Sequence, residues 1–206
     1  RTGSGYWELF QRAHHYAEKV ATGELPFLLT SCCPSWSMLT KKFFPDLVDE
    51  VSQELTPMVA TARTIKQKHP NAKVVFIGPC ASKKLEASRR SVRSDVDFVI
   101  TFEELQAMFD AKDIDFDNYE GESSFHDATG AGRGYAVAGG VANAIEQCIN
   151  EYYPDIDVKI EHAEGLADCK KIVDTCKGRQ DEWMSDRRNG MSGRMCCRSG
   201  NESSGE

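Results

Sequence analysis

Lys73-Val-Val-Phe-Ile-Gly78 runs without a break into Pro79 and Cys80. An apolar run of this kind predicts a strand that is covered on both faces, as in a parallel sheet. A second apolar run, Pro26-Phe-Leu-Leu-Thr30, is too short for a helix and leads in the same way into Cys32-Cys33-Pro34. The two runs therefore predict buried strands that each end in a cysteine loop.

Two further strands are predicted at Asp97–Thr101 and Val158–Glu161. Thr101 also begins a helix, because Glu104 stands three residues further on and completes a capping box. Residues 112–136 are polar and glycine-rich and predict a loop. Strands that alternate with helices predict an α/β fold with mainly parallel sheets flanked by helices, in which ligands bind at the carboxyl ends of the strands. The predicted helices cover residues 7–21, 36–43, 57–68 with Thr56 as cap, 102–111, 136–152 and 165–176.

The composition argues against several classes of protein. The net charge of −7 over 206 residues disfavours nucleic-acid binding, which needs a basic surface. No apolar run approaches the roughly 20 residues that cross a bilayer, and no secretory signal opens the chain. The eight cysteines therefore predict metal ligands or buried thiols of a cytoplasmic protein rather than disulfides. The first residue is Arg1 rather than Met, which predicts that N-terminal sequence is missing.

Both cysteine loops carry residue types that suit a metal centre. Thiolates are soft ligands that bind iron–sulfur clusters, and Cys33 and Cys80 each follow a strand end, so that they can converge. Buried thiols without a ligand role are the alternative for Cys32 and Cys33. Lys83 and Lys84 lie one helical turn after Cys80, where a lysine can donate to an anionic metal ligand; the alternative is a solvated pair of charges.

Two motifs, in this order, resemble the signatures of the FeFe (iron-only) hydrogenases. Thr30-Ser-Cys-Cys-Pro-Ser-Trp36 is similar to the first signature, and Gly78-Pro-Cys-Ala-Ser-Lys-Lys-Leu-Glu86 is similar to the second. The resemblance covers about residues 22 to 177. Ser35 and Gly78 depart from the best-studied members and indicate a subgroup with Cys-Cys-Pro-Ser-Trp and Gly-Pro-Cys signatures.

The resemblance implies a two-lobed catalytic domain that reversibly reduces protons to dihydrogen. Its cofactor would be a 4Fe-4S cluster bridged to a di-iron subcluster that carries CO, cyanide and a bridging dithiolate amine. Cys33 and Cys80 would ligate the cluster. Cys32 would be the proton-relay thiol, and Lys83 would donate a hydrogen bond to a cyanide. Ser52 would belong to the proton path, and a ferredoxin-like domain or protein would exchange electrons with the site.

Two other functions stay open. A non-catalytic iron–sulfur protein of the cluster-assembly or prelamin-recognition type is related to these hydrogenases. Such a protein would have no use for a relay thiol or a cyanide donor. A thiol redox protein would use Cys32 and Cys33, although a disulfide between neighbours is strained and the chain has no Cys-x-x-Cys motif.

The C-terminal residues differ in character from the rest. Residues 1–178 are interpreted as a partial catalytic domain, and residues 179–206, which lack apolar periodicity, as a non-native, disordered tail. The family's third signature, Glu-Gly-Met-x-Cys-x-Gly-Gly-Cys, is absent, and Cys196-Cys197 have the wrong spacing for it. One valid back-translation of residues 183–200, read one base later, encodes GCLIEGMGCPGGCVAGA, which contains the missing signature. The tail is therefore interpreted as the third cysteine loop read out of frame, and the chain as written is expected to be inactive.

The remaining candidates have structural interpretations. Cys148, Cys169 and Cys176 are predicted to be core thiols on helices. His14 and His15 are predicted at the surface, with a proton path as the alternative. The second loop is followed by a basic cluster that is either a solvated surface or a partner site: Arg89, Arg90 and Arg93.

Overall fold

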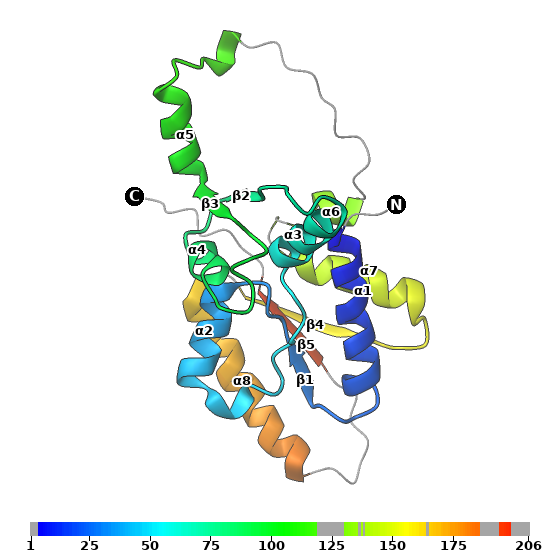
Figure 1. The fold of residues 1–206 in the computed structure, drawn as a ribbon. Helices are drawn as coiled ribbons and strands as arrows, with labels where there is room; N and C mark the ends of the chain where they lie inside the picture. The colour runs from blue at the N-terminus through cyan, green and yellow to red at the C-terminus, as the bar shows by residue number, and fades with distance from the viewer. Residues whose placement is uncertain are drawn as a thin grey trace.

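The structure is a computed structural model that describes residues 4–118, 130–135, 137, 139–163, 165–185 and 194–198. Short strands alternate with helices along most of this length (Figure 1). The strands are β1 (Phe27–Leu29), β2 (Val75–Gly78), β3 (Phe98–Thr101), β4 (Lys159–Ala163) and β5 (Arg194–Arg198). The helices are α1 (Ser4–His15), continued by a π-helical turn η1 (Tyr16–Val20), α2 (Pro34–Phe43), the 3-10 turn η2 (Pro45–Leu47), α3 (Pro57–Lys68), α4 (Ser82–Ala87), α5 (Phe102–Asp110), the 3-10 turn η3 (Phe116–Asn118), α6 (Gly130–Arg133), α7 (Gly140–Tyr152) and α8 (Gly165–Ser185).

The larger sheet is parallel and has the strand order β1-β5-β4. Helices α1 and α7 lie on one side of it and α2 and α8 on the other (Figure 1). Successive side chains of a strand point to opposite faces, and β1 follows this rule. Its Leu28 joins the core formed with α1 and α7, whereas Phe27 and Leu29 join the core formed with α2 and α8. β1 is thus buried on both faces, as its apolar sequence predicts.

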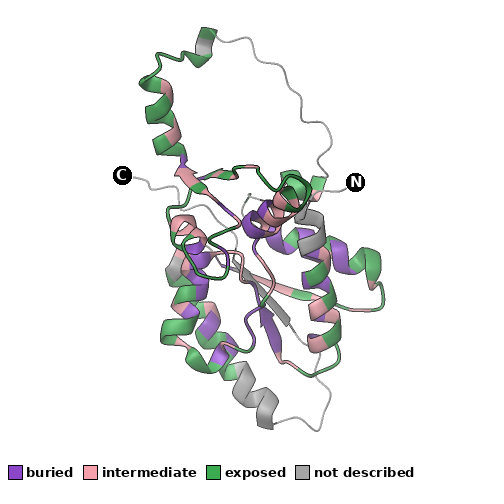
Figure 2. Cartoon of the chain, in the orientation of Figure 1, coloured by how far each residue is buried: buried purple, intermediate pink, exposed green. Residues whose placement is uncertain are grey.

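The smaller sheet consists of β2 and β3, which pair in parallel with Val75 opposite Phe98. One face packs on α3 in a third core, which includes Phe76 and Val99. The other face is open: Val75 is 45%, Ile77 43% and Phe98 61% exposed (Figure 2). The prediction that residues 73–78 are covered on both faces was therefore wrong, because among the described residues only those on the α3 side pack against this sheet.

The predicted elements are largely confirmed, with corrections at their ends. α8 continues nine residues beyond the predicted end at Cys176, to Ser185. Arg194–Arg198 forms the middle strand of the larger sheet, between β1 and β4. The structure thus describes two backbone segments of residues 179–206, and the remainder lies outside the described residues, so the interpretation of 179–206 as a non-native, disordered tail stays a prediction. The predicted loop 112–136 contains η3 and α6, and most of its other residues lie outside the described part of the chain.

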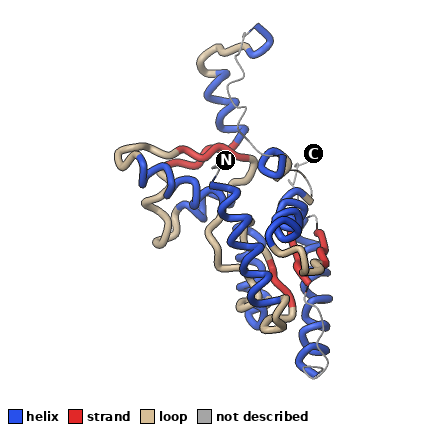
Figure 3. Tube along the Cα trace, turned by 90° about the vertical axis from the view of Figure 1, so that its right-hand side faces the viewer, coloured by secondary structure: helices blue, strands red, loops and turns tan. Residues whose placement is uncertain are grey.

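Two helices, α7 and α5, have distinctive positions in the fold. The N-terminus of α7 approaches the backbone after α6 so closely that a Cβ on Gly140 would lie 1.8 Å from the carbonyl oxygen of Gly134. Only glycine permits that approach. Helix α5 projects away from both sheets, as the view turned by 90° shows (Figure 3). None of the helices that the structure describes has the length and apolar character needed to cross a membrane.

Candidate functional site

The first cysteine loop is held between β1 and α2. Cys33 is the residue before α2 and has an extended backbone (φ −99°, ψ 115°), and Pro34 occupies the first turn of the helix. Proline suits that position because the N–H it lacks would have no partner within the helix. The Trp36 indole Nε1 donates to the Thr30 carbonyl oxygen at 2.9 Å. This buried bond spans the loop and fixes the half-buried Cys32 and Cys33 at the end of β1.

The second cysteine loop connects β2 to α4. Cys80 lies two residues after the end of β2, and its exposed Sγ is 2.9 Å from the Ser82 Oγ. The Lys83 amide donates to the Cys80 carbonyl oxygen at 3.2 Å, which turns the chain into α4. The thiol therefore stands at the carboxyl end of its strand, as the sequence predicts.

Lys83 joins the two loops. Its ammonium donates to the Cys32 carbonyl oxygen at 3.0 Å and to Glu86 Oε2 at 2.8 Å. Glu86 is 4% exposed, and its other oxygen accepts a 2.5 Å bond from the Thr56 hydroxyl. Thr56 precedes α3 as predicted, but its side chain makes no cap bond there, since it bonds to Glu86 instead. An ammonium has three donors, so the two bonds to the chain leave one N–H of Lys83 for a further acceptor near Cys32.

Ser52 lies beside the first loop. Residues 50–52 run next to β1: the Leu29 amide donates to the Glu50 carbonyl oxygen and the Ser52 amide to the Leu29 carbonyl oxygen, both at 2.8 Å. Ser52 is 2% exposed, and its hydroxyl oxygen has no hydrogen-bond partner among the described residues. A buried hydroxyl without a partner is uncommon in a folded protein. The structure thus brings Ser52 to the segment that carries Cys32.

A partly buried ion pair near this segment was missed by the sequence analysis. His15 Nδ1 lies 2.6 Å from Glu54 Oε1, and the two side chains are 23% and 14% exposed. The hydrogen bond that His15 donates to Glu54 raises the pKa of His15, although burial opposes the rise. Burial alone would raise the pKa of Glu54, but the bond to His15, a backbone bond and the charges of His15 and Arg12 together lower it. The prediction that His15 is a surface residue was therefore wrong, because its partner stands 39 residues away in the sequence.

The three remaining cysteines that the structure describes by burial and His14 have the predicted environments. Cys148 is buried in the core with α1 and α7, and Cys169 and Cys176 are buried in the core with α2 and α8. Burial raises the pKa of Cys148 to about 11, so this thiol stays protonated at neutral pH. His14 contacts Tyr153 and Glu18 at the surface, as expected.

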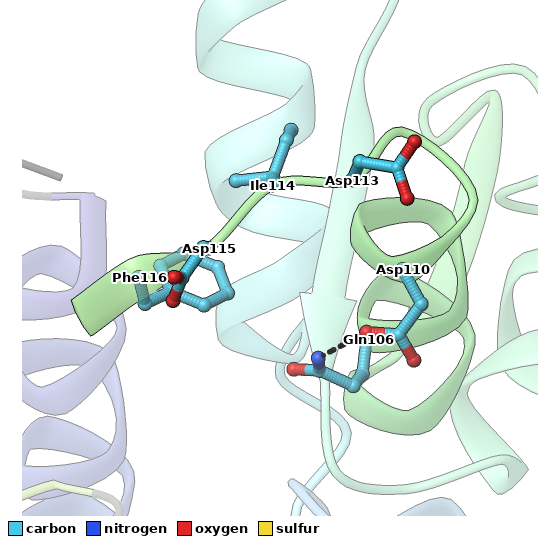
Figure 4. A pocket seen from close by; sticks show the side chains of 6 residues that line it. All are labelled: Gln106, Asp110, Asp113, Ile114, Asp115 and Phe116. Carbon is cyan, nitrogen blue, oxygen red and sulfur yellow. Dashed lines mark hydrogen bonds between the residues drawn. The ribbon is translucent and has the colours of Figure 1, made fainter. Parts of the chain in front are cut away.

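A hollow of about 600 Å³ lies between α5 and η3, and no residue of either cysteine loop lines it (Figure 4). It is lined by Gln106, Asp110, Asp113, Ile114, Asp115 and Phe116, and Gln106 Nε2 donates to Asp110 Oδ1 at 2.8 Å. Its polar groups include three carboxylates and no thiol or imidazole. The hollow therefore does not match the chemistry expected of the cysteine loops.

The donor atoms at the loops suit an iron–sulfur cluster in part. Cys33 and Cys80 supply soft thiolates on two loops that Lys83 joins, and a cluster requires about four such ligands. Within the described ranges, no three His, Cys, Asp or Glu side chains lie close enough together to hold one metal ion. The described site thus offers two thiols and an ammonium, and a cluster bound there would need further ligands from another segment.

Comparison with known proteins identifies the family. The family described as "Iron only hydrogenase large subunit, C-terminal domain" matches residues 7–200. The chain belongs to this family. Iron hydrogenase 1 of Clostridium pasteurianum is 28% identical over 182 residues, which make up 80% of this chain and 30% of that protein. Cytosolic Fe-S cluster assembly factor NAR1 of Kluyveromyces lactis is 37% identical over 102 residues, which make up 50% of this chain and 22% of that protein.

Solved structures agree with the family fold. An FeFe-hydrogenase superposes with a TM-score of 0.68 at 20% identity, covering 96% of this chain and 65% of the solved one. The apo form of the FeFe-hydrogenase HydA1 from Chlamydomonas reinhardtii superposes with a TM-score of 0.65 at 21% identity, over 97% and 64% of the two chains. These superpositions confirm the predicted α/β fold with parallel sheets. This hydrogenase-family chain spans less than a third of the two curated relatives and under two thirds of the solved structures.

Proposed function

We propose that this hydrogenase-family domain binds an iron–sulfur cofactor at its two cysteine loops for the reversible reduction of protons to dihydrogen. The observation that carries the proposal is the placement of Lys83 between the loops, next to Cys32 and with one donor to spare. An ammonium held in this way stabilises an anionic ligand through a charge-assisted hydrogen bond.

Each residue at the loops has a role in this proposal. Cys33 and Cys80 would ligate a 4Fe-4S cluster, and Lys83 would orient a cyanide of the attached di-iron subcluster. When bound, the cofactor would supply the redox chemistry, whereas the chain orients it and manages protons. Cys32 would hold a proton at its Sγ, and Ser52 would pass protons toward it. A ferredoxin-like protein or domain would be the electron partner, and the cytoplasm the compartment.

The third cysteine loop is the part that the chain as written lacks. We propose that residues 183–199 are this loop translated one base out of frame, in the subgroup with Cys-Cys-Pro-Ser-Trp and Gly-Pro-Cys signatures. The 206-residue chain is then a partial catalytic domain and produces no dihydrogen. Sequencing of the underlying DNA tests the frame directly: a neighbouring frame without the signature refutes it.

Anaerobic reconstitution tests the cofactor. The 206-residue chain and a variant with residues 183–199 replaced by GCLIEGMGCPGGCVAGA are loaded with iron and sulfide, and iron is counted per chain after desalting. The frame-restored variant is expected to retain about four irons, as a 4Fe-4S cluster requires. The substitutions Cys33→Ala and Cys80→Ala, each made in the frame-restored variant, should remove most of the bound iron. Cys169→Ala, in the core, is the control and should lose none. Equal retention by the three substituted proteins would refute the assignment.

A cluster-assembly function is the second candidate, because the Kluyveromyces lactis assembly factor is 37% identical over half of this chain. The two functions differ in their need for a di-iron subcluster. After addition of a synthetic di-iron complex, a hydrogenase site should show infrared bands of bound CO and cyanide, and Lys83→Met should shift or abolish the cyanide bands. An iron-loaded protein without these bands would support the assembly function instead.

A further inference from the structure

The residue before Cys32 is held from the side of α1. The Arg12 guanidinium Nη2 donates to the Ser31 Oγ at 3.4 Å, and the Ser31 Oγ donates to the Glu54 carbonyl oxygen at 3.4 Å. Cys32 packs against the core formed with α1 and α7, whereas Cys33 packs against the core formed with α2 and α8. The contact between Ser31 and α1 therefore lies on the side of the loop where Cys32 packs.

Charged side chains fix the two groups that hold Ser31. Arg12 is fully buried in α1. Glu54 belongs to no helix or strand, so bonds of its side chain decide where its backbone lies. One carboxylate oxygen bonds to His15 at 2.6 Å, and the charge of Arg12 also acts on this carboxylate. The other oxygen is buried and has no hydrogen-bond partner among the described residues. We call Arg12, His15 and Glu54 the charged triad.

His15 is the member of the charged triad that changes its charge near neutral pH. The titratable groups that face this end of α1 come from the segment before α3, from η1 and from α7: Glu54, Glu18, Lys19 and Tyr153. The bond to Glu54 favours the protonated imidazole, and a charge-assisted hydrogen bond is stronger than a neutral one. The hold on Glu54 therefore weakens as pH rises through the pKa of His15.

We propose that the charged triad positions the Cys32 thiol by holding Ser31 against α1. The proton-carrying function of Cys32 rests on the proposed function, whereas the hold on its loop does not. Lys83 bonds to the Cys32 carbonyl oxygen at 3.0 Å, so contacts from α1 and from α4 fix this part of the loop together. A thiol that passes protons must stay within hydrogen-bond reach of its partner, and a shift of about 1 Å is enough to impair the transfer. The triad acts through Ser31 and does not have to touch the reacting atoms.

Hydrogen exchange followed by mass spectrometry tests the proposal on the 206-residue chain without cofactor. The exchange rates of residues 30–37 are divided by those of an unstructured peptide at the same pH, so that the remaining pH dependence reports local opening. Between pH 6 and pH 9 the protection of this loop is expected to fall at least about threefold, because His15 loses its charge. His15→Gln should show the lower protection at both pH values. The strand β3 is the internal control and should keep its protection.

Ser31 decides whether the charged triad acts through the loop. Ser31→Ala should remove the pH dependence of loop protection, while the titration of His15, followed by nuclear magnetic resonance, stays unchanged. Ser31→Thr keeps the hydroxyl and should restore the pH dependence. His14→Gln is the matched control, since His14 precedes His15 and contacts Glu18 at the surface. This control should behave as the unmodified chain does.

Three results would overturn the positioning role. The first is a loop protection that does not change with pH in the unmodified chain, and the second is a pH dependence that survives in Ser31→Ala. The third is an equal loss in the loop and in β3, which would show that the pair of His15 and Glu54 stabilises the whole fold instead. None of these measurements needs iron, so the iron counts described above judge the proposed function separately.

Discussion

Replacement of Glu86 by glutamine removes the counter-charge of Lys83 while it keeps the shape of the side chain. The ammonium and the carboxylate are 2.8 Å apart, and their side chains are 14% and 5% exposed. At that distance their attraction is about 6 kcal/mol for an effective dielectric constant of 20. Glutamine still accepts hydrogen bonds, and Lys83 keeps its bond to the Cys32 carbonyl oxygen. We therefore expect Glu86→Gln to lower the free energy of unfolding by about 2 kcal/mol, below the roughly 3–5 kcal/mol reported for fully broken buried pairs.

Urea unfolding followed by circular dichroism measures this loss, and a double-mutant cycle with Lys83→Met separates the pair from its surroundings. The two single variants should lose more together than the double variant does, with a coupling of about 2 kcal/mol. Lys84 and Glu104 form an exposed pair, which serves as the control, and its cycle should give at most about 0.5 kcal/mol. Additive losses in the Lys83–Glu86 cycle would refute a stabilising ion pair between these two residues of α4.

Three further predictions concern other parts of the fold. The His15–Glu54 pair stabilises the fold between the lowered pKa of Glu54 and the raised pKa of His15, and this stabilisation is lost as pH rises through the pKa of His15. Glu54→Gln should therefore lower the free energy of unfolding by about 1–2 kcal/mol at pH 6 and by less at pH 9, as thermal unfolding measures. An equal loss at both pH values would contradict this prediction. Gly140→Ala should lower the free energy of unfolding by at least about 1–3 kcal/mol, because its Cβ would meet the backbone of Gly134; a neutral effect would show that α6 and α7 are not so close. Cys148→Ser should destabilise the core by about 1–3 kcal/mol without affecting bound iron, and lost iron would contradict its interpretation as a core thiol.

Local patterns predicted most of the fold because they depend on neighbouring residues. The capping box of Thr101 and Glu104 is present with both of its bonds, and Pro34 occupies the first turn of α2 as predicted. The burial of β2 was predicted less well. Its apolar sequence is compatible with cover on both faces, but whether a cover is present depends on segments far away in the chain. Val75 and Ile77 show that the outer face is open.

The candidate site likewise has a part that local sequence predicts and a part that depends on distant contacts. Two short motifs predicted Cys33, Cys80 and Lys83 as site residues, because each motif follows the end of a strand, Cys33 after β1 of the larger sheet and Cys80 after β2 of the smaller sheet. The contacts that join the loops were not predictable. The bond from Lys83 to the Cys32 carbonyl oxygen spans 51 residues, and the pairing of Thr56 with Glu86 spans 30. The first contact accompanies the packing of α4 against α2, and the second joins α4 to the residue before α3; no local pattern exists for either.

The position of β5 bears on the interpretation of the C-terminal residues. β5 lies between β1 and β4, with Leu29 opposite Cys196, and runs parallel to both. The middle strand of a parallel sheet that is covered by helices on both sides is ordinarily apolar, but Arg-Met-Cys-Cys-Arg fills it here. The out-of-frame reading offers the apolar run Cys-Leu-Ile at positions 184–186, directly before the third cysteine signature. If this run took the middle position between β1 and β4 in place of residues 194–198, the parallel strand would deliver that signature to the edge that carries the first cysteine loop.

This reasoning predicts a gain in stability that does not depend on iron. In the absence of metal, replacement of residues 183–199 by GCLIEGMGCPGGCVAGA should raise the melting temperature by several degrees, since about 1 kcal/mol corresponds to roughly 2–4 °C in a domain of this size. The same seventeen residues in scrambled order are the control and should give no rise. A melting temperature that is unchanged or lower in the frame-restored variant would show that the middle position does not favour the apolar strand. The frame interpretation would then lose its structural support, although the two cysteine loops and Lys83 would keep theirs.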